Sequence, residues 1–305
     1  MDITIGITPS SFAAVDPAPR ELLEKEGFVV RPNPYGRRLT KEESIGNLEG
    51  LDGLIAGLEP LDAEVLRTTD KLKVISRVGI GIANIDMPEA SSRGVAVFNT
   101  PEAPTVAVAE ATLMSAMMLL RNVIPNNAAL HRREWTKQVG RSLAGLNVLF
   151  VGYGRIGRRT ADLFRASGAR ILVFDPYAEA ASMKHGEELV ELEAGLSRAD
   201  ITTLHASGEA EIIGTREFEC MKQGGILLNP SRGQLVNEEA LCRALDDEVL
   251  LSCWFDAFWT EPYEGPLCDY PQALLTPHNC TYTEQCRRSM EMEAAENLIA
   301  HFKGA

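Results

Sequence analysis

Short apolar runs alternate with helical patterns along almost the whole chain, which predicts an α/β protein with parallel sheets. In the first third, apolar runs at residues 3–8, 27–30, 51–56, 73–76 and 95–98 are expected to form strands. A helix is expected around residues 20–26, and Asp62 is expected to cap a short helix that contains Val65 and Leu66. We therefore expect residues 1–98 to form one α/β domain.

The second part of the chain is organised around a glycine-rich turn. An apolar run at residues 148–151 leads into Gly152-Tyr-Gly-Arg-Ile-Gly157, followed by a helix to about Ser167 and an apolar run at 171–174 that ends at Asp175. Strand, glycine turn, helix, strand and acid in this order predict a dinucleotide-binding unit, with the pyrophosphate at the helix N-terminus. Asp175 can bind both ribose hydroxyls and would repel a 2′-phosphate, so NAD is favoured over NADP. The alternative is a plain glycine turn in an α/β sheet.

Polar residues follow the ends of the later strands. Apolar runs at residues 199–205, 225–229, 250–255 and 274–278 are expected to continue the second sheet. Arg232, Asp256, Glu261 and His278 each come after one of these runs. Because ligands of open parallel sheets bind beyond the carboxyl ends of the strands, these side chains can gather at one crevice.

One long helix is expected to form an interface. Residues 105–121 carry apolar side chains on nearly every face, a pattern that requires burial all round. We interpret this helix as the domain connector and as part of a homodimer contact through the NAD-binding domain. The sequence of residues 132–141 is interpreted as the charged end of a helix, where a solvated surface competes with a role in binding a substrate anion.

Composition and charge exclude several classes of partner. The net charge of −13 argues against a nucleic acid or an anionic membrane, and it requires a locally basic site for any anionic substrate. The first residues contain neither a basic region nor a long apolar stretch, so they do not resemble a signal peptide. The apolar residues 106–120 are too few to cross a bilayer, so we expect a cytoplasmic protein. The six cysteines show no paired metal spacing, so we expect reduced structural thiols and no metal site.

Hydride transfer needs more than a dinucleotide. It needs a group that exchanges a proton with the substrate oxygen, and a cation for the carboxylate and the carbonyl. A histidine oriented by a carboxylate meets the first need and an arginine meets the second. The chain offers one such set, Arg232, Glu261 and His278, while His205 ends a strand near the expected cofactor edge and could line the site.

A second glycine-rich loop, residues 77–86, follows a strand of the first domain. Its backbone N–H groups could hold a small anion such as a carboxylate, or the loop could be a tight strand-to-helix turn. This loop is one of six sequence blocks that carry a family resemblance. The six blocks are residues 77–86, 99–110, 151–157, 221–233, 256–262 and 276–278. Together they resemble the D-isomer-specific 2-hydroxyacid dehydrogenase family, and among its members those like D-3-phosphoglycerate dehydrogenase.

The resemblance implies an architecture and a mechanism. Two Rossmann or flavodoxin-like parallel-sheet domains would enclose a cleft, with residues 1–98 and 284–305 forming a discontinuous substrate-binding domain and residues 99–283 the NAD-binding domain. His278 would be the general acid and base, and Glu261 would stabilise its protonated form. Arg232 would bind the substrate carboxylate and the C2 oxygen.

The family pattern also implies further contacts. Main-chain N–H groups would hold the second carboxylate oxygen, Asp256 would contact the nicotinamide carboxamide, and Thr105 would lie near the nicotinamide. The residues expected to contact the substrate are Arg77, Val78, Gly79, Arg232 and His278. The residues expected to contact NAD are Thr105, Gly152, Tyr153, Gly154, Arg155, Ile156, Gly157, Asp175, Pro176, His205, Ala206, Pro230 and Asp256.

Two departures and two alternatives remain. The family usually has an acid where this chain has Ala83, and the loop at residues 206–211 is shorter than usual and carries two acids. The basic residues of 132–141, with Arg77, could hold a second anion such as the phosphate of 3-phosphoglycerate, whereas glyoxylate, hydroxypyruvate or another small 2-keto acid would not need them. An NAD-sensing, corepressor-like binding protein on the same fold is the alternative outside catalysis.

Overall fold

The computed structural model describes residues 2–183 and 185–304, and it divides into two compact units. Unit 1 comprises residues 1–104 and 282–305, and unit 2 comprises residues 105–281. The junctions predicted from the sequence lie at 98/99 and 283/284. Each unit is built on one parallel sheet, so the predicted fold class of two parallel-sheet α/β domains is confirmed.

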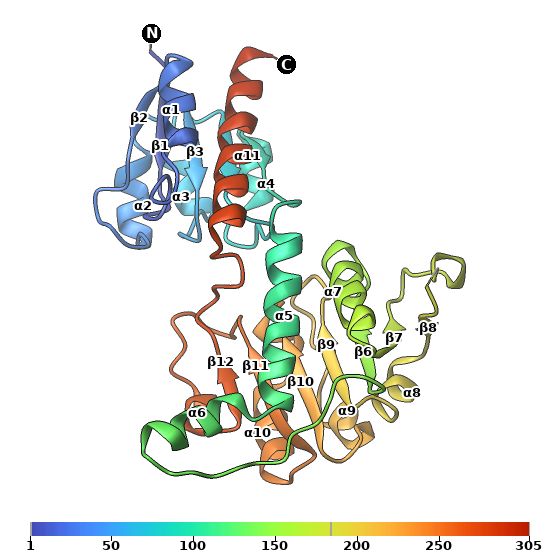
Figure 1. Ribbon diagram of the computed structural model, residues 1–305. Helices are drawn as coiled ribbons and strands as arrows, with labels where there is room; N and C mark the ends of the chain where they lie inside the picture. Colours follow the sequence, from blue (N-terminus) through green and yellow to red (C-terminus); the bar gives the residue numbers. More distant parts are fainter. Residues whose placement is uncertain (1, 184, 305) are drawn as a thin grey trace. The chain divides into compact units, whose positions relative to one another are not determined.

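Unit 1 contains a five-stranded parallel sheet in the order β2-β1-β3-β4-β5, which is the strand order of flavodoxin-like folds (Figure 1). Helices α2, α3 and α4 pack their apolar side chains on one face. Helix α11 packs against β3, β4 and α1, and α1 also contacts β2. The strands are β1 (Thr4–Ile7), β2 (Val29–Arg31), β3 (Gly53–Ala56), β4 (Val74–Arg77) and β5 (Ala96–Phe98). The helices are α1 (Ala18–Lys25), α2 (Lys41–Leu48), α3 (Ala63–Arg67), α4 (Met87–Ser92) and α11 (Glu284–Lys303).

Local sequence explains where two of these helices begin. The Asp62 side chain accepts a hydrogen bond from Val65 N at 3.0 Å, which is the predicted cap of α3. Helix α2 was not predicted, although Thr40 and Glu43 form a reciprocal capping box at its start. Its sequence contains few apolar residues, so periodicity alone does not reveal it.

Unit 2 contains a seven-stranded parallel sheet in the order β12-β11-β10-β9-β6-β7-β8. Strands β7 and β8 are added on one side of β6, and strands β9 to β12 on the other, so the strand order switches between β6 and β9. Open sheets of this type bind nucleotides at such a switch point. The strands are β6 (Asn147–Val151), β7 (Arg170–Phe174), β8 (Glu188–Leu189), β9 (Ile201–Leu204), β10 (Gly225–Asn229), β11 (Leu250–Phe255) and β12 (Ala273–Leu275). The α-helices are α5 (Pro104–Leu120), α6 (Val123–His131), α7 (Arg155–Ala166), α8 (Leu192–Leu196), α9 (Thr215–Cys220) and α10 (Glu238–Asp246). Short 3-10 turns lie at η1 (Ala180–Ser182), η2 (Gly233–Leu235) and η3 (Pro266–Asp269).

The sheet of unit 2 is covered on both faces. One apolar cluster joins the sheet to α5 and α7, and another joins it to α8, α9 and α10. Val148, Phe150 and Phe164 in the first cluster and Leu149, Val151 and Leu241 in the second are fully buried or nearly so. Alternate residues of β6 therefore serve the two cores, which fixes the register of the strand that leads into the glycine turn.

One expectation about the segment after α5 is wrong. Residues 132–141 are not the end of a helix, because α6 ends at His131 and Arg133 has a φ of 64°, outside the helical region. Within one chain, α5 leaves Val106, Met114 and Met117 48%, 50% and 37% exposed, so its burial on every face depends on the expected partner copy and stays a prediction. None of the described helices is by itself long and apolar enough to cross a membrane, and α5 and α6 meet that test only together, with a 63° bend.

Candidate active site

The glycine turn of unit 2 is shaped by close backbone approaches. Gly152 has a φ of 94°, and a Cβ there would lie 2.5 Å from Ala206 N. A Cβ on Gly157 would lie 2.4 Å from the Gly152 carbonyl oxygen, so only glycine lets α7 start this close to the turn. At Gly154, the N-cap of α7, no described atom lies within 4 Å of the added Cβ. That open side at a helix N-terminus suits a pyrophosphate.

Asp175 lies at the end of β7 beside this turn. Its Oδ2 accepts a hydrogen bond from Tyr153 N at 2.7 Å, and Oδ1 accepts one from Tyr177 N at 2.8 Å. These contacts fix the carboxylate beside the glycine turn, and its contact with the ribose stays a prediction. The Tyr153 hydroxyl donates to Glu187 at 3.0 Å, and burial and that carboxylate raise the pKa of Tyr153, so the phenol stays neutral.

Two polar atoms near the expected cofactor edge are buried without a hydrogen-bond partner among the described residues, Thr105 Oγ1 and His205 Nδ1. The His205 ring stacks on Phe150 with centroids 5.7 Å apart, and its Nε2 lies 3.0 Å from Thr203 Oγ1. Burial lowers the pKa of His205 to about 3, so its ring is neutral at physiological pH. A neutral ring and unmet polar atoms fit a bound dinucleotide better than a closed core.

His278 and Glu261 form a direct pair in unit 2. His278 Nδ1 lies 2.9 Å and 3.0 Å from the two carboxylate oxygens of Glu261, and the two side chains remain 34% and 26% exposed. Burial pushes the pKa of Glu261 upward, but the His278 hydrogen bond and charge, the Phe258 N–H and the Arg232 charge outweigh it, so this pKa is lowered. Because Glu261 occupies Nδ1, Nε2 is the ring nitrogen left to exchange a proton with a substrate.

Arg232 lies close to the His278–Glu261 pair because the loop that carries it packs against the loop that carries Glu261. A Cβ on Gly233 would lie 2.3 Å from both Phe258 C and Trp259 N, so the loop after β10 lies directly against the loop after β11. Gln234 Nε2 also donates to the Trp259 carbonyl at 3.0 Å. The structure thus gathers Arg232, Glu261 and His278 within one unit, and the glycine is a signal that the sequence analysis overlooked.

Asp256 holds the segment that carries His278. Its carboxylate accepts hydrogen bonds from Thr276 Oγ1 at 2.6 Å, Asn279 N at 3.0 Å and Cys280 N at 3.1 Å, and the residue is 1% exposed. His278 itself has a φ of 50°, a strained value for a non-glycine residue. These contacts support a role in fixing the histidine, whereas the nicotinamide contact expected of Asp256 stays a prediction.

The remaining expected NAD contacts of unit 2 cluster around these loops. Pro230 lies in the loop after β10, where Ser231 Oγ donates to the Leu204 carbonyl at 2.7 Å and so joins the loops after β9 and β10. Ala206 adjoins Gly152, Pro176 follows Asp175, and Arg155 and Ile156 form the first turn of α7. Their contacts with NAD stay predictions.

In unit 1, the loop after β4 has its N–H groups engaged within the unit. Val78 N donates to the Ala56 carbonyl at 2.9 Å, and Gly79 N donates to Thr100 Oγ1 at 2.7 Å. The Arg77 guanidinium lies against Gly79, where an added Cβ would be 1.4 Å from Arg77 Nη1. A substrate carboxylate at Val78 and Gly79 would share donors that already have partners, so the substrate contacts expected of Arg77, Val78 and Gly79 stay predictions.

The basic segment 132–141 does not act as one cluster. Arg132 pairs with Glu134 at 2.8 Å on the surface, and Arg141 pairs with Asp200 at 2.8 Å. Asp200 also accepts from Lys222 Nζ and from Asn147 N at the start of β6. Arg141 therefore lies at the amino edge of the sheet, whereas the glycine turn, Arg232 and His278 follow carboxyl ends of strands.

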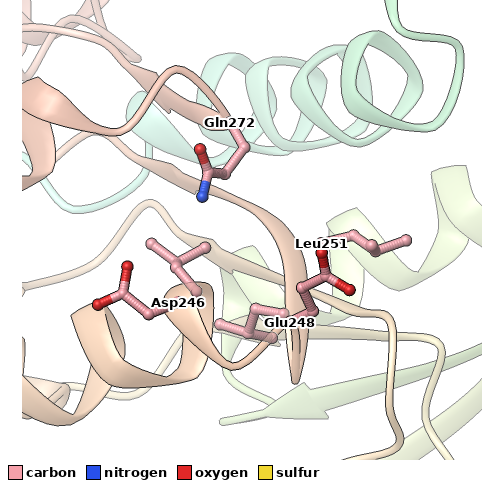
Figure 2. A pocket seen from close by; sticks show the side chains of 6 residues that line it. Asp246, Glu248, Leu251 and Gln272 are labelled. Atoms are coloured by element: carbon pink, nitrogen blue, oxygen red, sulfur yellow. The ribbon is translucent and has the colours of Figure 1, made fainter.

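A surface hollow lies at the same amino edge (Figure 2). It has a volume of about 400 Å³ and is lined by Leu245, Asp246, Glu248, Leu250, Leu251 and Gln272. Two carboxylates and no cation line it, so it does not suit an anionic substrate.

Cys280 is buried, and burial and the Asp256 charge raise the pKa of its thiol, which favours a packing role. The described residues contain no group of three His, Cys, Asp or Glu side chains arranged for a metal ion.

Known proteins match this chain over most of its length. The family model described as the NAD binding domain of D-isomer specific 2-hydroxyacid dehydrogenases matches residues 113–280, which confirms NAD as the cofactor. D-3-phosphoglycerate dehydrogenase of Methanocaldococcus jannaschii is 33% identical over 279 residues, 87% of this chain and 52% of that protein. Glyoxylate reductase of Thermofilum pendens is 32% identical over 279 residues, 87% of this chain and 82% of that protein.

Solved structures match as well. A glyoxylate reductase from Paecilomyes thermophila has a TM-score of 0.88 and 25% identity, covering 99% of this chain and 96% of that one. The chain spans only about half the length of the D-3-phosphoglycerate dehydrogenases that it matches.

Proposed function

Because the chain belongs to the D-isomer specific 2-hydroxyacid dehydrogenase family, we propose that it interconverts a D-2-hydroxy acid and a 2-keto acid with NAD. The observation that carries this proposal is the His278–Glu261 pair, 2.9 Å apart and influenced by the Arg232 charge. A proton donor held by an anion, with a cation at hand, is what carbonyl reduction requires of a protein.

Each residue of this set has a defined task. The glycine turn and Asp175 would hold NADH, which when bound would supply a hydride for C2 of the keto acid. Arg232 holds the substrate carboxylate and draws electron density onto the C2 oxygen. Protonated His278 gives its Nε2 proton to that oxygen, while Glu261 stabilises the imidazolium before the transfer. In the opposite direction neutral His278 takes the hydroxyl proton, so lower pH favours reduction and higher pH favours oxidation.

The tail of the substrate is the open part of the proposal. Relatives of this chain are named D-3-phosphoglycerate dehydrogenase and glyoxylate reductase, which differ in whether the acid has a phosphate tail. An anionic tail such as that of 3-phosphoglycerate would rest on Arg77, Arg133 or Lys137, because Arg132 and Arg141 are paired with acids. Glyoxylate, hydroxypyruvate or a similar small 2-keto acid needs no second cation.

The activity is tested by NADH oxidation at 340 nm with 3-phosphohydroxypyruvate, hydroxypyruvate, glyoxylate and sulfopyruvate. We expect turnover of at least one of these acids, and His278→Ala should lose at least ~100-fold in rate. His131→Ala, a surface histidine at the end of α6, is the matched control and should keep wild-type activity. NADH binding without turnover of any keto acid would instead favour an NAD-sensing binding protein.

A homodimer through unit 2 is also proposed. Large apolar side chains are exposed along one stretch of the chain, with Trp135 80% and Val139 98% exposed. The others in this stretch are Met114, Met117, Val123, Ile124 and Leu130. A second copy of the chain is the partner that would bury them, because they continue the apolar surface of α5.

Light scattering after gel filtration tests the dimer. Wild type should elute with twice the mass of one chain, and Val139→Asp should shift the population towards the monomer. Leu251→Asp, at an exposed leucine of β11, is the control and should stay dimeric. A monomeric wild type would remove this proposal, while the cytoplasm as the location of the protein stays a prediction.

A further inference from the structure

A buried acid lies beside the glycine turn of unit 2 and is not among the residues expected to contact NAD. The side chain of Glu187 is 2% exposed, and Glu187 directly precedes β8, the edge strand of the sheet. Its Oε1 accepts hydrogen bonds from the Tyr153 hydroxyl at 3.0 Å and from Arg165 Nη2 at 2.5 Å, and its Oε2 accepts one from His185 N at 2.8 Å. Acids are seldom buried this completely unless they are paired and hydrogen-bonded, and these three donors meet that requirement.

The donors around Glu187 keep it ionised and connect it to both ends of one helix. Burial raises the pKa of the Glu187 carboxyl, but backbone N–H groups, the Tyr153 hydroxyl and the Arg165 charge outweigh burial, so this pKa is lowered. Tyr153 precedes α7 and Arg165 lies in its last turn, so side chains from both ends of the helix meet at one carboxylate. The pairing of β8 with β7 fixes the backbone that carries this carboxylate.

Tyr153 is the residue between the first two glycines of the turn, and side-chain groups hold it at three points. Its backbone N–H donates to Asp175 Oδ2 at 2.7 Å, and its carbonyl accepts from Arg158 Nε at 2.9 Å. Its hydroxyl donates to Glu187, and the Arg158 guanidinium lies over its ring, 5.6 Å from the ring centre. Because Tyr153 is only 4% exposed, its ring cannot leave this position without breaking these contacts.

The glycine turn has little stiffness of its own, because glycine gives the backbone the widest choice of φ and ψ. Gly152 has a positive φ of 94° and Gly154 has an extended conformation, and Tyr153 joins the two. The side chain of Tyr153 is therefore the anchor that the glycines lack. A turn that already has its bound shape loses less conformational entropy when a ligand binds, so this anchor strengthens binding.

We propose that Glu187 is a positioning residue for NAD, which acts through the Tyr153 hydroxyl to hold the glycine turn in the shape that receives the pyrophosphate. The same link steadies the Tyr153 N–H, which orients the carboxylate of Asp175. Glu187 thus influences the cofactor through Tyr153 and needs no contact with it. The proposal concerns the cofactor alone, so it holds whichever acid is turned over.

Equilibrium binding tests this proposal without turnover. Calorimetry of NADH with the full chain gives the Kd and the number of sites separately, so a loss of folded protein changes the number of sites and leaves the Kd unchanged. Glu187→Gln keeps the size of the side chain but cannot accept from all three donors, and Tyr153→Phe removes only the hydroxyl. Each should raise the Kd of NADH by about tenfold, because a hydrogen bond to a charged group is worth at least that factor. Glu188→Gln, at the neighbouring acid whose side chain is 55% exposed, is the matched control and should keep the wild-type Kd.

Two further comparisons show whether Glu187 acts through Tyr153 and on which half of the cofactor. The variant with both substitutions should bind NADH no more weakly than Glu187→Gln alone, because both changes break the same link. ADP-ribose carries the pyrophosphate and the adenosine but no nicotinamide, and its Kd should rise by the same factor as that of NADH. A wild-type Kd in Glu187→Gln, additive losses in the double variant, or a loss with NADH but not with ADP-ribose overturns the proposal, as does a wild type that does not bind NADH.

Tyr153→Phe decides the matter if Glu187→Gln does not fold. It leaves the pair of Glu187 and Arg165 in place, so a wild-type Kd in this variant would contradict the proposed link.

The proposed activity is judged separately by NADH oxidation. With a keto acid that wild type turns over, Glu187→Gln should raise the KM for NADH while kcat stays within about twofold of wild type, as expected when only binding is weakened. A fall in kcat at an unchanged KM would count against the positioning role. If wild type turns over no keto acid, the activity is disproved and the Kd values still decide the role of Glu187.

Discussion

The pair of His278 and Glu261 makes a quantitative prediction for Glu261→Gln. The substitution keeps the size of the side chain and removes its charge. Two unit charges 3 Å apart attract by about 5.5 kcal/mol at an effective dielectric constant of 20. The side chains are 34% and 26% exposed, so solvent screens this value, and about 1.5–3 kcal/mol is the usual worth of a hydrogen bond to a charged group. A factor of ten in rate corresponds to about 1.4 kcal/mol, so we expect kcat/KM for reduction of a keto acid to fall by about 10- to 100-fold.

The sign of this change follows from the charges. The pKa of Glu261 is lowered, so this carboxylate stays ionised throughout the neutral range and can stabilise protonated His278. Without that charge the protonated form that donates to the substrate oxygen is less stable, so reduction at neutral pH should slow in Glu261→Gln.

The assay is kcat/KM against pH in both directions, from about pH 5.5 to pH 10, for wild type and Glu261→Gln. Glu264→Gln removes a nearby exposed charge and serves as the control, with a profile expected to match wild type. If the wild-type and Glu261→Gln profiles coincide, Glu261 does not hold the proton of His278 and the assigned role is wrong.

Four further substitutions examine other residues of unit 2. Asp256→Asn should lower kcat by about tenfold or more with little change in the Kd of NADH, because Asp256 holds the His278 segment; a larger loss in NADH affinity than in kcat would support a nicotinamide contact instead. Burial lowers the pKa of His205 to about 3 from an ordinary value of about 6.5, so the unfolded chain binds the extra proton as pH falls below 6.5 and folding stability is lost. In urea titrations without cofactor, wild type should lose about 2 kcal/mol more between pH 7 and pH 5 than His205→Gln, and equal losses would contradict a neutral buried ring. Gly157→Ala should lower both Tm and NADH affinity because its Cβ meets the Gly152 carbonyl at 2.4 Å, whereas Gly154→Ala should lower NADH affinity alone; a lowered Tm for Gly154→Ala would show that its open side is occupied by protein.

Local patterns were sufficient to predict the sheets and the pairing of His278 with Glu261. Gly152, Gly157 and Asp175 have spacings that only one backbone arrangement satisfies, so their placement follows from sequence. Glu261 and His278 could be paired because each follows a strand of one parallel sheet, and such ends meet at one edge. These inferences depend on the direction of each strand and on the alternation of apolar runs with helical patterns, which are properties of short segments.

Other features depend on contacts between distant segments. The hydrogen bonds of Asp256 to three residues beyond β12 could not be read from a spacing of more than 20 residues. The end of α6 was misjudged because the charged residues after it fit a solvated helix, while the φ of Arg133 is set by the turn that follows.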